Sequence, residues 1–176
     1  MIEEMFDVVD ELDQVVFQAP RSVVHAQKLL HRAVHVFVFN PAGELLLQLR
    51  SAAKDEYPLC YTSSASGHLA AGELYAAAAA RELAEELGLQ CTLEWLAKFP
   101  AAPETAFEHT MLYRAVSAET PRPDPVEIAE ANFYRLDQVA ALIVSEPARI
   151  SPPLRVLFDW YTECGPGAAR AISGLD

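Results

Sequence analysis

Residues 67–89 read GHLAAGELYAAAAARELAEELGL, and the character of this stretch decides the fold. From Leu74 to Leu87 it consists mainly of Ala, Leu, Glu and Arg and contains neither Gly nor Pro, a composition that strongly favours an α-helix. Gly72 precedes this segment and Gly88 follows it, and glycines at such places commonly mark helix ends. The stretch therefore predicts a loop, a helix over residues 74–87 and a stop.

The predicted helix has two chemically different faces. At helical spacing one face carries four apolar side chains that we expect to pack against a core: Ala76, Ala80, Leu83 and Leu87. Another face carries three carboxylates at positions i, i+3 and i+4: Glu82, Glu85 and Glu86. Because like charges at this spacing destabilise a helix, the stripe is either a solvated face or a site that holds cations.

The glycines and charged residues of this stretch also match a known signature at every fixed position. The matching residues are Gly67, Glu73, Arg81, Glu82, Glu85, Glu86 and Gly88. At average residue usage such a match arises by chance with a probability of roughly 10⁻⁸ per start point. The chain therefore resembles the Nudix hydrolases. The resemblance implies the Nudix fold, an α/β architecture in which a mixed β-sheet is sandwiched between α-helices.

Length and composition indicate one domain over residues 1–165, followed by a flexible tail over residues 166–176. The formal net charge of −12 argues against nucleic acids and anionic membranes as partners, since both require a positive surface. The three cysteines are too widely spaced for a zinc knuckle and are expected to be reduced: Cys60, Cys91 and Cys164. No basic, apolar leader and no membrane-spanning run is evident, so we expect a cytoplasmic protein, either a monomer or a homodimer.

Apolar runs and turn signals predict the other elements. Upstream of the signature we expect a hairpin over 6–17 with its turn at 10–13, a helical segment between Pro20 and His31, and a second hairpin with strands at 33–39 and 44–49. Downstream we expect strands at 92–99, 108–116 and 131–134, then helices at 136–144 and 152–163. Mixed strands with helices on both faces give an α/β sandwich.

A closer resemblance joins the segment LLHRAVHVFVFNPAGELLLQLRSAAKDEYP, residues 29–58, to the Nudix branch that contains isopentenyl-diphosphate isomerase. In that isomerase, histidines and strand glutamates hold a divalent metal. The positions that match these ligands are His31, His68 and Glu108, with His25 as a looser match. A second strand glutamate is expected two residues before Glu108, where this chain has Ala106. The isomerase-type metal site is therefore incomplete at that position.

Two departures from the isomerase favour hydrolysis. The isomerase uses a cysteine immediately before the signature glycine to move a proton at carbon, and Ser66 stands there with a hydroxyl that is far too weak an acid. The isomerase also has a degenerate signature, whereas this chain keeps all its glutamates. We therefore expect hydrolysis of a diphosphate linkage, with an isomerase or a non-catalytic ligand-binding module of the same fold as the alternatives.

Basic residues that could bind a diphosphate lie upstream of the signature. Arg50 and Lys54 stand four apart after the second strand, where the isomerase family places phosphate-binding cations, and Arg21 matches a third such position. His31 and His68 are candidates for either metal or substrate contacts. His35 and His109 are expected to be structural.

The resemblance implies a mechanism for a small-molecule diphosphate substrate. Mg²⁺ or Mn²⁺, held by Glu82, Glu85 and Glu86, would bridge the diphosphate and lower the pKa of the attacking water. Arg81 would orient a glutamate by ion pairing within the helix. Either Glu86 or Glu108 would act as the base, and the sequence leaves both open.

Overall fold

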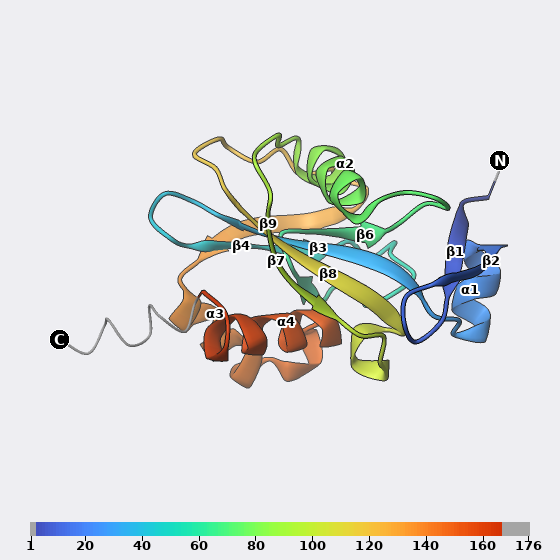
Figure 1. Ribbon diagram of the computed structural model, residues 1–176. Helices are drawn as coiled ribbons and strands as arrows, with labels where there is room; N and C mark the ends of the chain where they lie inside the picture. The colour runs from blue at the N-terminus through green and yellow to red at the C-terminus, as the bar shows by residue number, and fades with distance from the viewer. Residues whose placement is uncertain (1–2, 167–176) are drawn as a thin grey trace.

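The computed structural model describes residues 3–166 and shows a mixed β-sheet with helices on both faces (Figure 1). The strands are β1 (Met5–Val9), β2 (Val15–Pro20), β3 (His31–Phe39), β4 (Leu45–Arg50), β5 (Tyr61–Thr62), β6 (Ala65–His68), β7 (Glu94–Phe99), β8 (Glu108–Val116) and β9 (Ile128–Tyr134). The helices are α1 (Arg21–Gln27), α2 (Tyr75–Leu87), α3 (Leu136–Ser145) and α4 (Pro152–Glu163), with 3-10 turns η1 (Pro103–Thr105) and η2 (Pro147–Arg149). This architecture confirms the predicted α/β sandwich.

The strand β3 organises the sheet. It runs parallel to β8 from His31, opposite Glu108, to Phe39, opposite Val116. It also pairs antiparallel with β6, but it meets β4 only at Phe39 and Leu45, next to their connecting turn. The strand β4 instead pairs with β5 and β9. The β3–β6 pair and the β4–β5 pair therefore separate from each other, and this separation makes room for a site.

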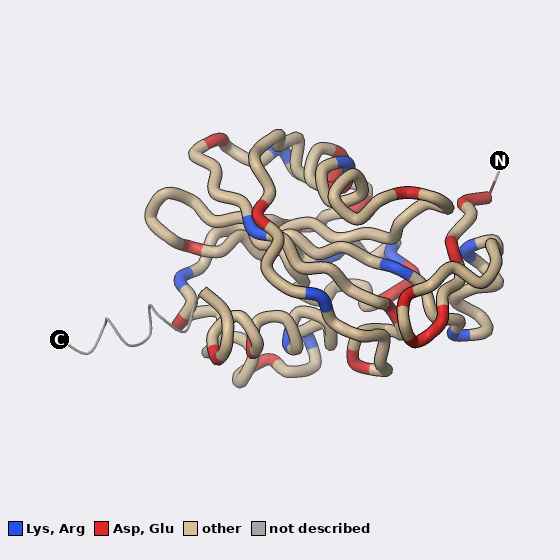
Figure 2. The backbone as a smooth tube through the Cα atoms, in the orientation of Figure 1, with Lys and Arg blue, Asp and Glu red and all other residues tan. Residues whose placement is uncertain are grey.

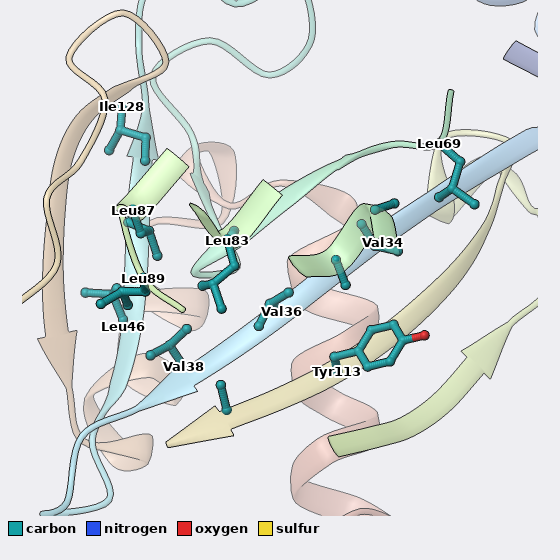
Figure 3. Packing of buried hydrophobic residues seen from close by; sticks show 14 residues of the cluster. Val34, Val36, Val38, Leu46, Leu69, Leu83, Leu87, Leu89, Tyr113 and Ile128 are labelled. Atoms are coloured by element: carbon teal, nitrogen blue, oxygen red, sulfur yellow. The ribbon is translucent and has the colours of Figure 1, made fainter. Parts of the chain in front are cut away.

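Alternation along β3 explains why both faces of the sheet are covered. Val34, Val36 and Val38 pack towards α2 together with Leu83 and Leu87 of that helix (Figure 3). Phe37 and Phe39 point the other way and join a second core cluster with residues of α3 and α4. Figure 1 shows α2 on one face of the sheet and the pair α3 and α4 on the other. A strand buried on both sides reads as the continuous apolar run that the sequence shows.

The helix expected over 74–87 is observed as α2, and it ends at Gly88, which takes the left-handed conformation with φ 64°. Its buried residues are Ala78, Ala79, Leu83, Glu86 and Leu87. The prediction that Ala76 and Ala80 face the core was wrong, because both are exposed. The helix is rotated so that its glutamate edge turns towards the sheet, where Glu86 finds polar partners.

Several element boundaries differ from the expectations. The helical segment between Pro20 and His31 stops at Gln27, because Lys28 takes a left-handed conformation with φ 52° and His31 already belongs to β3. The strand β9 begins at Ile128, three residues earlier than expected. The short strands β5 and β6 were not predicted. The expected tail over 166–176 lies outside the described residues apart from Pro166.

The N-terminal hairpin is tied to the sheet and to the loop before α2. Asp13, in its turn, accepts hydrogen bonds from Arg32 Nε at 2.5 Å and from Tyr75 Oη at 3.0 Å, and it pairs with Lys98. Asp7 Oδ2 accepts a hydrogen bond of 2.9 Å from the backbone N–H of Gly72. These contacts fix β1, β2 and α1 at one end of the sheet, where charged residues gather (Figure 2).

Within residues 3–166, no helix is long and apolar enough to cross a membrane. The cysteines Cys60, Cys91 and Cys164 are all free thiols in this part of the chain.

Candidate active site

A cavity of about 400 Å³ opens where the β3–β6 pair separates from the β4–β5 pair. Its acidic lining includes the three glutamates of α2, namely Glu82, Glu85 and Glu86, together with Glu56, Glu108 and Glu127. Its basic lining includes Arg21, Arg50, Lys54 and Arg81. The structure therefore brings the predicted metal ligands and the predicted phosphate-binding residues to one cavity.

Glu86 is the most deeply buried of the three helix glutamates, with 4% of its surface exposed. Its Oε2 accepts hydrogen bonds from Gln48 Nε2 at 2.8 Å and from the backbone N–H of Ser66 at 3.0 Å. Burial and the neighbouring charge of Glu82 raise the pKa of Glu86 to about 8. The carboxylate is thus held in one position. Lys54 offsets part of its charge, but Glu86 forms no ion pair within residues 3–166, and a bound cation would supply the missing partner.

Glu82 depends on two other residues of the signature. Arg81 NH1 lies 2.6 Å from Glu82 Oε1 and 3.1 Å from Glu85 Oε2. The same guanidinium donates from Nε and NH2 to the two oxygens of Glu73, both at 2.9 Å. A Cβ atom at Gly67 would overlap the Glu82 carboxylate, 2.7 Å from Oε2 and closer still to Oε1. Arg81 therefore ties the loop to the helix, and Gly67 leaves space for Glu82.

A second polar group lies beside the glutamates and is termed the histidine cluster: His25, His31, His68 and Glu108. The three imidazole rings lie with centroids 4.9–5.3 Å apart. His68 Nε2 is 2.8 Å from Glu108 Oε1, and His31 Nε2 is 3.7 Å from the same oxygen. Among residues 3–166, the buried Nε2 atoms of His25 and His31 have no hydrogen-bond partner.

Burial sets the protonation of the histidine cluster. It lowers the pKa of His31 to about 4 and that of His68 to about 3, and it raises the pKa of Glu108 to about 7. Both imidazoles are therefore neutral near pH 7, which is the form that binds metals. The nitrogens of His25, His31 and His68 lie within 4.8 Å of one another and could hold one ion. Unpartnered buried nitrogens are costly, so these residues fit a metal well.

Each basic residue at the cavity already has a protein partner. Arg50 Nε donates to the carbonyl oxygen of Glu56 at 2.8 Å. Lys54 pairs with Glu127, and Arg21 pairs with Glu4 at 3.5 Å. An anionic ligand would compete with these acidic partners for the side chains of Arg21 and Lys54, whereas Arg50 keeps other donors free of that backbone contact.

The remaining histidines have structural contacts. His109 Nε2 is 2.9 Å from the carbonyl oxygen of Asp10, and its Nδ1 accepts from the backbone N–H of Ala101 at 3.4 Å. His35 Nδ1 is 2.7 Å from Ser63 Oγ, although its ring also lines the cavity. Sequence reasoning missed Gln48 and Glu56. Both lie in the segment 29–58 that resembles the isomerase branch, but neither belongs to the glycine and glutamate signature, and the fold brings them to the site.

A family model described as the NUDIX domain matches residues 29–161. The chain belongs to the Nudix family. It is 38% identical over 153 residues to an isopentenyl-diphosphate Delta-isomerase of Nocardia farcinica, an alignment that covers 83% of this chain and 87% of that protein. It is 36% identical to an uncharacterized Nudix hydrolase of Pseudomonas aeruginosa, over 75% of this chain and 79% of the relative.

The fold also agrees with that of a solved crystal structure. The chain superposes on the crystal structure of DR0079 from Deinococcus radiodurans with a TM-score of 0.79 and 27% sequence identity, covering 89% of this chain and 98% of the other. The Nudix relatives thus include proteins named as isomerases and proteins named as hydrolases. The reaction must therefore be argued from the residues of this Nudix site.

Proposed function

We propose that the protein is a Mg²⁺- or Mn²⁺-dependent Nudix pyrophosphohydrolase that cleaves a diphosphate linkage in a nucleoside diphosphate derivative or another organic diphosphate. The observation that carries this proposal is the joint presence of Glu82, Glu85 and Glu86 at one cavity that is also lined by Arg50 and Lys54. Oxygen ligands suit hard divalent cations, and the basic side chains suit phosphate oxygens.

Different residues of the cavity would bind the metal ion, position its ligands and bind the phosphates. A bound divalent cation would neutralise charge on the diphosphate and lower the pKa of a coordinated water. Glu82, Glu85 and Glu86 would hold it, and Arg81 would keep Glu82 in place through its contacts with Glu73. Arg50 and Lys54 would bind the phosphates, with Arg21 and His68 at the edge of the same pocket.

Glu86 is the base that we favour. It is held by two donors, Gln48 and the N–H of Ser66, and its Oε1 makes no hydrogen bond within residues 3–166, so one oxygen stays available for a proton. Glu108, the other candidate, also has one oxygen without a hydrogen bond in this part of the chain, but its Oε1 lies 2.8 Å from His68 and 3.7 Å from His31, so its carboxylate belongs to the histidine cluster. With a cation alongside, the raised pKa of Glu86 would fall, and the carboxylate would accept a proton from the attacking water.

A second candidate function is isomerisation of an isoprenoid diphosphate. It is favoured by the 38% identity to an isomerase and by the histidine cluster. Against it stands Ser66, whose backbone N–H supports Glu86 but whose hydroxyl would have to replace a thiol in proton transfer at carbon. The intact set of signature glutamates also favours chemistry at phosphorus.

The test is a phosphate-release screen in Mg²⁺ and in Mn²⁺ across nucleoside triphosphates, dinucleotides, nucleotide sugars and isoprenyl diphosphates. We expect Glu86→Gln to lose at least a hundredfold in kcat on any substrate found, because it neutralises the metal ligand and base at constant volume. Glu130→Gln, an exposed substitution with the same charge change, should keep full activity. Equal activity of wild type and Glu86→Gln would reject the assignment.

Two coarser expectations accompany this proposal. The substrate would be a small molecule, since the cavity of about 400 Å³ is of the size that such ligands occupy. The free thiols are consistent with a reducing compartment, and we propose that the enzyme acts in the cytoplasm.

A further inference from the structure

One carboxylate at the cavity has no role in the site as described so far. Glu56 lies in the loop between β4 and β5, and one of its oxygens falls within 4.8 Å of ligand atoms of both His68 and Glu108. His68 belongs at the same time to the group of three histidines whose nitrogens lie within 4.8 Å of one another. The two groups therefore share His68 and adjoin.

We propose that Glu56 is a carboxylate ligand of a divalent transition-metal site that it forms together with the histidine cluster. In this chain the loop would supply the second carboxylate that Ala106 cannot supply. Ala106 lines the same cavity and lies between η1 and β8. The metal site would thus be complete, with its last ligand delivered from a different element of the fold.

The distances between ligand atoms in the histidine cluster are close to those around a bound metal ion. Ligands of one first-row divalent ion, at bond lengths of about 2.0–2.2 Å, lie roughly 3–4 Å apart. The distances are 2.8 Å between His68 Nε2 and Glu108 Oε1 and 3.7 Å between His31 Nε2 and Glu108 Oε1, which are near this range. Glu56 joins this neighbourhood through His68 and Glu108, since ligand atoms of these three residues lie within 4.8 Å of one another.

The backbone of the loop is held in a conformation that presents Glu56. Arg50 Nε donates a hydrogen bond of 2.8 Å to the Glu56 carbonyl oxygen. The next residue, Tyr57, adopts the left-handed region with φ 48°, and Leu59 does so with φ 57°. Such conformations are unfavourable for side chains of this size and persist only where surrounding contacts impose them. The loop is therefore shaped around a defined position of residue 56.

The charge around Glu56 is only partly balanced, because Arg21 and Arg50 act on the neighbouring Glu108 but form no ion pair with it within residues 3–166. The Glu56 carboxylate makes no hydrogen bond or ion pair within residues 3–166, and it lies beside the buried carboxylate of Glu108. Two adjacent carboxylates repel each other unless a proton or a cation lies between them. The buried Nε2 atoms of His25 and His31 also lack a partner, and a hydrogen-bond donor or a metal ion would satisfy them.

The donor set identifies the class of ion. Imidazole nitrogens with carboxylate oxygens suit Mn²⁺, Co²⁺ or Zn²⁺ better than Mg²⁺, which prefers oxygen ligands and water. This site is distinct from the cation position at the signature glutamates, and its existence does not depend on the proposed hydrolysis.

The experiment measures metal binding without substrate. Metal-free full-length protein is titrated with Co²⁺ in an excess of Mg²⁺, which occupies the oxygen-only position, and binding is followed by visible absorption. We expect one Co²⁺ per chain with the spectrum of an ion bound by imidazoles. Glu56→Gln should weaken binding at least tenfold and change the spectrum, because it removes a charged ligand. Asp55→Asn, an exposed neighbour in the same loop, should change the affinity less than twofold.

Each outcome decides the proposal. Equal Co²⁺ affinity and identical spectra for Glu56→Gln and Asp55→Asn would remove Glu56 from the site. Absence of stoichiometric binding by the wild type, or binding that survives both His31→Ala and His68→Ala, would overturn the site itself. Thermal melting of each metal-free variant shows that the comparison is made on folded protein. Failure here would leave the phosphate-release screen unaffected, because the two assays probe different ligands.

Discussion

Replacing Gly67 with alanine should lower the catalytic rate strongly and the stability of the fold only modestly, because the added methyl group would displace Glu82. A Cβ atom at this position would lie 2.7 Å from Glu82 Oε2, whereas ordinary van der Waals contact begins at 3.4 Å, and it would approach Oε1 and Cδ more closely still. The backbone of Gly67 is fixed by the pairing of β6 with β3, whereas the side chain of Glu82 can rotate. The Glu82 carboxylate must therefore move.

The size of the effect can be bounded. Glu82 would retreat by about 1 Å, and a misplacement of this size in a catalytic constellation can lower a rate roughly a hundredfold. The packing strain should lower the free energy of unfolding by about 1–3 kcal/mol. Glu82 would also lose its 2.6 Å contact with Arg81, so the displaced carboxylate would not be held in a single new position.

Gly72→Ala provides the matched control. Gly72 lies in the loop between β6 and α2 with φ 77°, and no atom lies within 4 Å of the Cβ that alanine would add. This substitution should cost about 1–2 kcal/mol through left-handed backbone strain while leaving kcat unchanged. The assay is kcat on the substrate identified in the screen, with unfolding followed in urea. Wild-type kcat in a folded Gly67→Ala variant would refute the reasoning.

Three further outcomes are expected. Lys54→Ala should raise KM about tenfold or more with a smaller effect on kcat, because it removes a charge-assisted phosphate contact of about 1.5–3 kcal/mol, and an unchanged KM in steady-state kinetics would place the phosphates elsewhere. Incubation with isopentenyl diphosphate should yield no dimethylallyl isomer by NMR, since Ser66 cannot replace a thiol, and isomer formed at a catalytic rate would reverse the choice of reaction. Asp13→Asn should destabilise the protein at pH 7, and this difference should narrow as the pH falls below about 3.9. Although burial alone would raise the pKa of Asp13, hydrogen bonds from Lys98, Arg32 and Tyr75 lower it. Its stabilisation is therefore present above the unfolded pKa of about 3.9 and is lost as pH falls through the folded pKa, so a gap in urea unfolding that does not narrow below about pH 3.9 would contradict this account.

Local sequence patterns were sufficient to predict the helices and strands that have a strong compositional signal. The helix α2 was predicted from composition and flanking glycines, and β3 from its apolar run, and both were confirmed. The rotation of α2 was not predictable in the same way. The exposure of Ala76 and Ala80 follows from the burial of Glu86 against Gln48, a residue 38 positions away in sequence.

The strands β5 and β6 were not predicted, and the two serines between them, Ser63 and Ser64, show the physical reason. Ser64 Oγ accepts a hydrogen bond of 2.8 Å from the backbone N–H of Val38 and donates one to the carbonyl oxygen of Leu46. It thereby bridges β3 and β4 where their backbones have separated. Ser63 is likewise fully buried and contacts His35. Polar residues that read as a loop are thus core residues, because they replace the missing strand pairing.

The strand β6 explains why the signature glutamates and the histidine cluster lie side by side. Three consecutive residues of β6 each contact a different glutamate: the N–H of Ser66 binds Glu86, Gly67 gives Glu82 its space, and His68 contacts Glu108. The register of β6 on β3, with Ala33 opposite His68, fixes all three contacts at once. A slip of one residue would turn every side chain of this strand to the other face. The pairing of β6 with β3 therefore sets the spacing between the signature glutamates and the histidine cluster, and neither group could be displaced without the other.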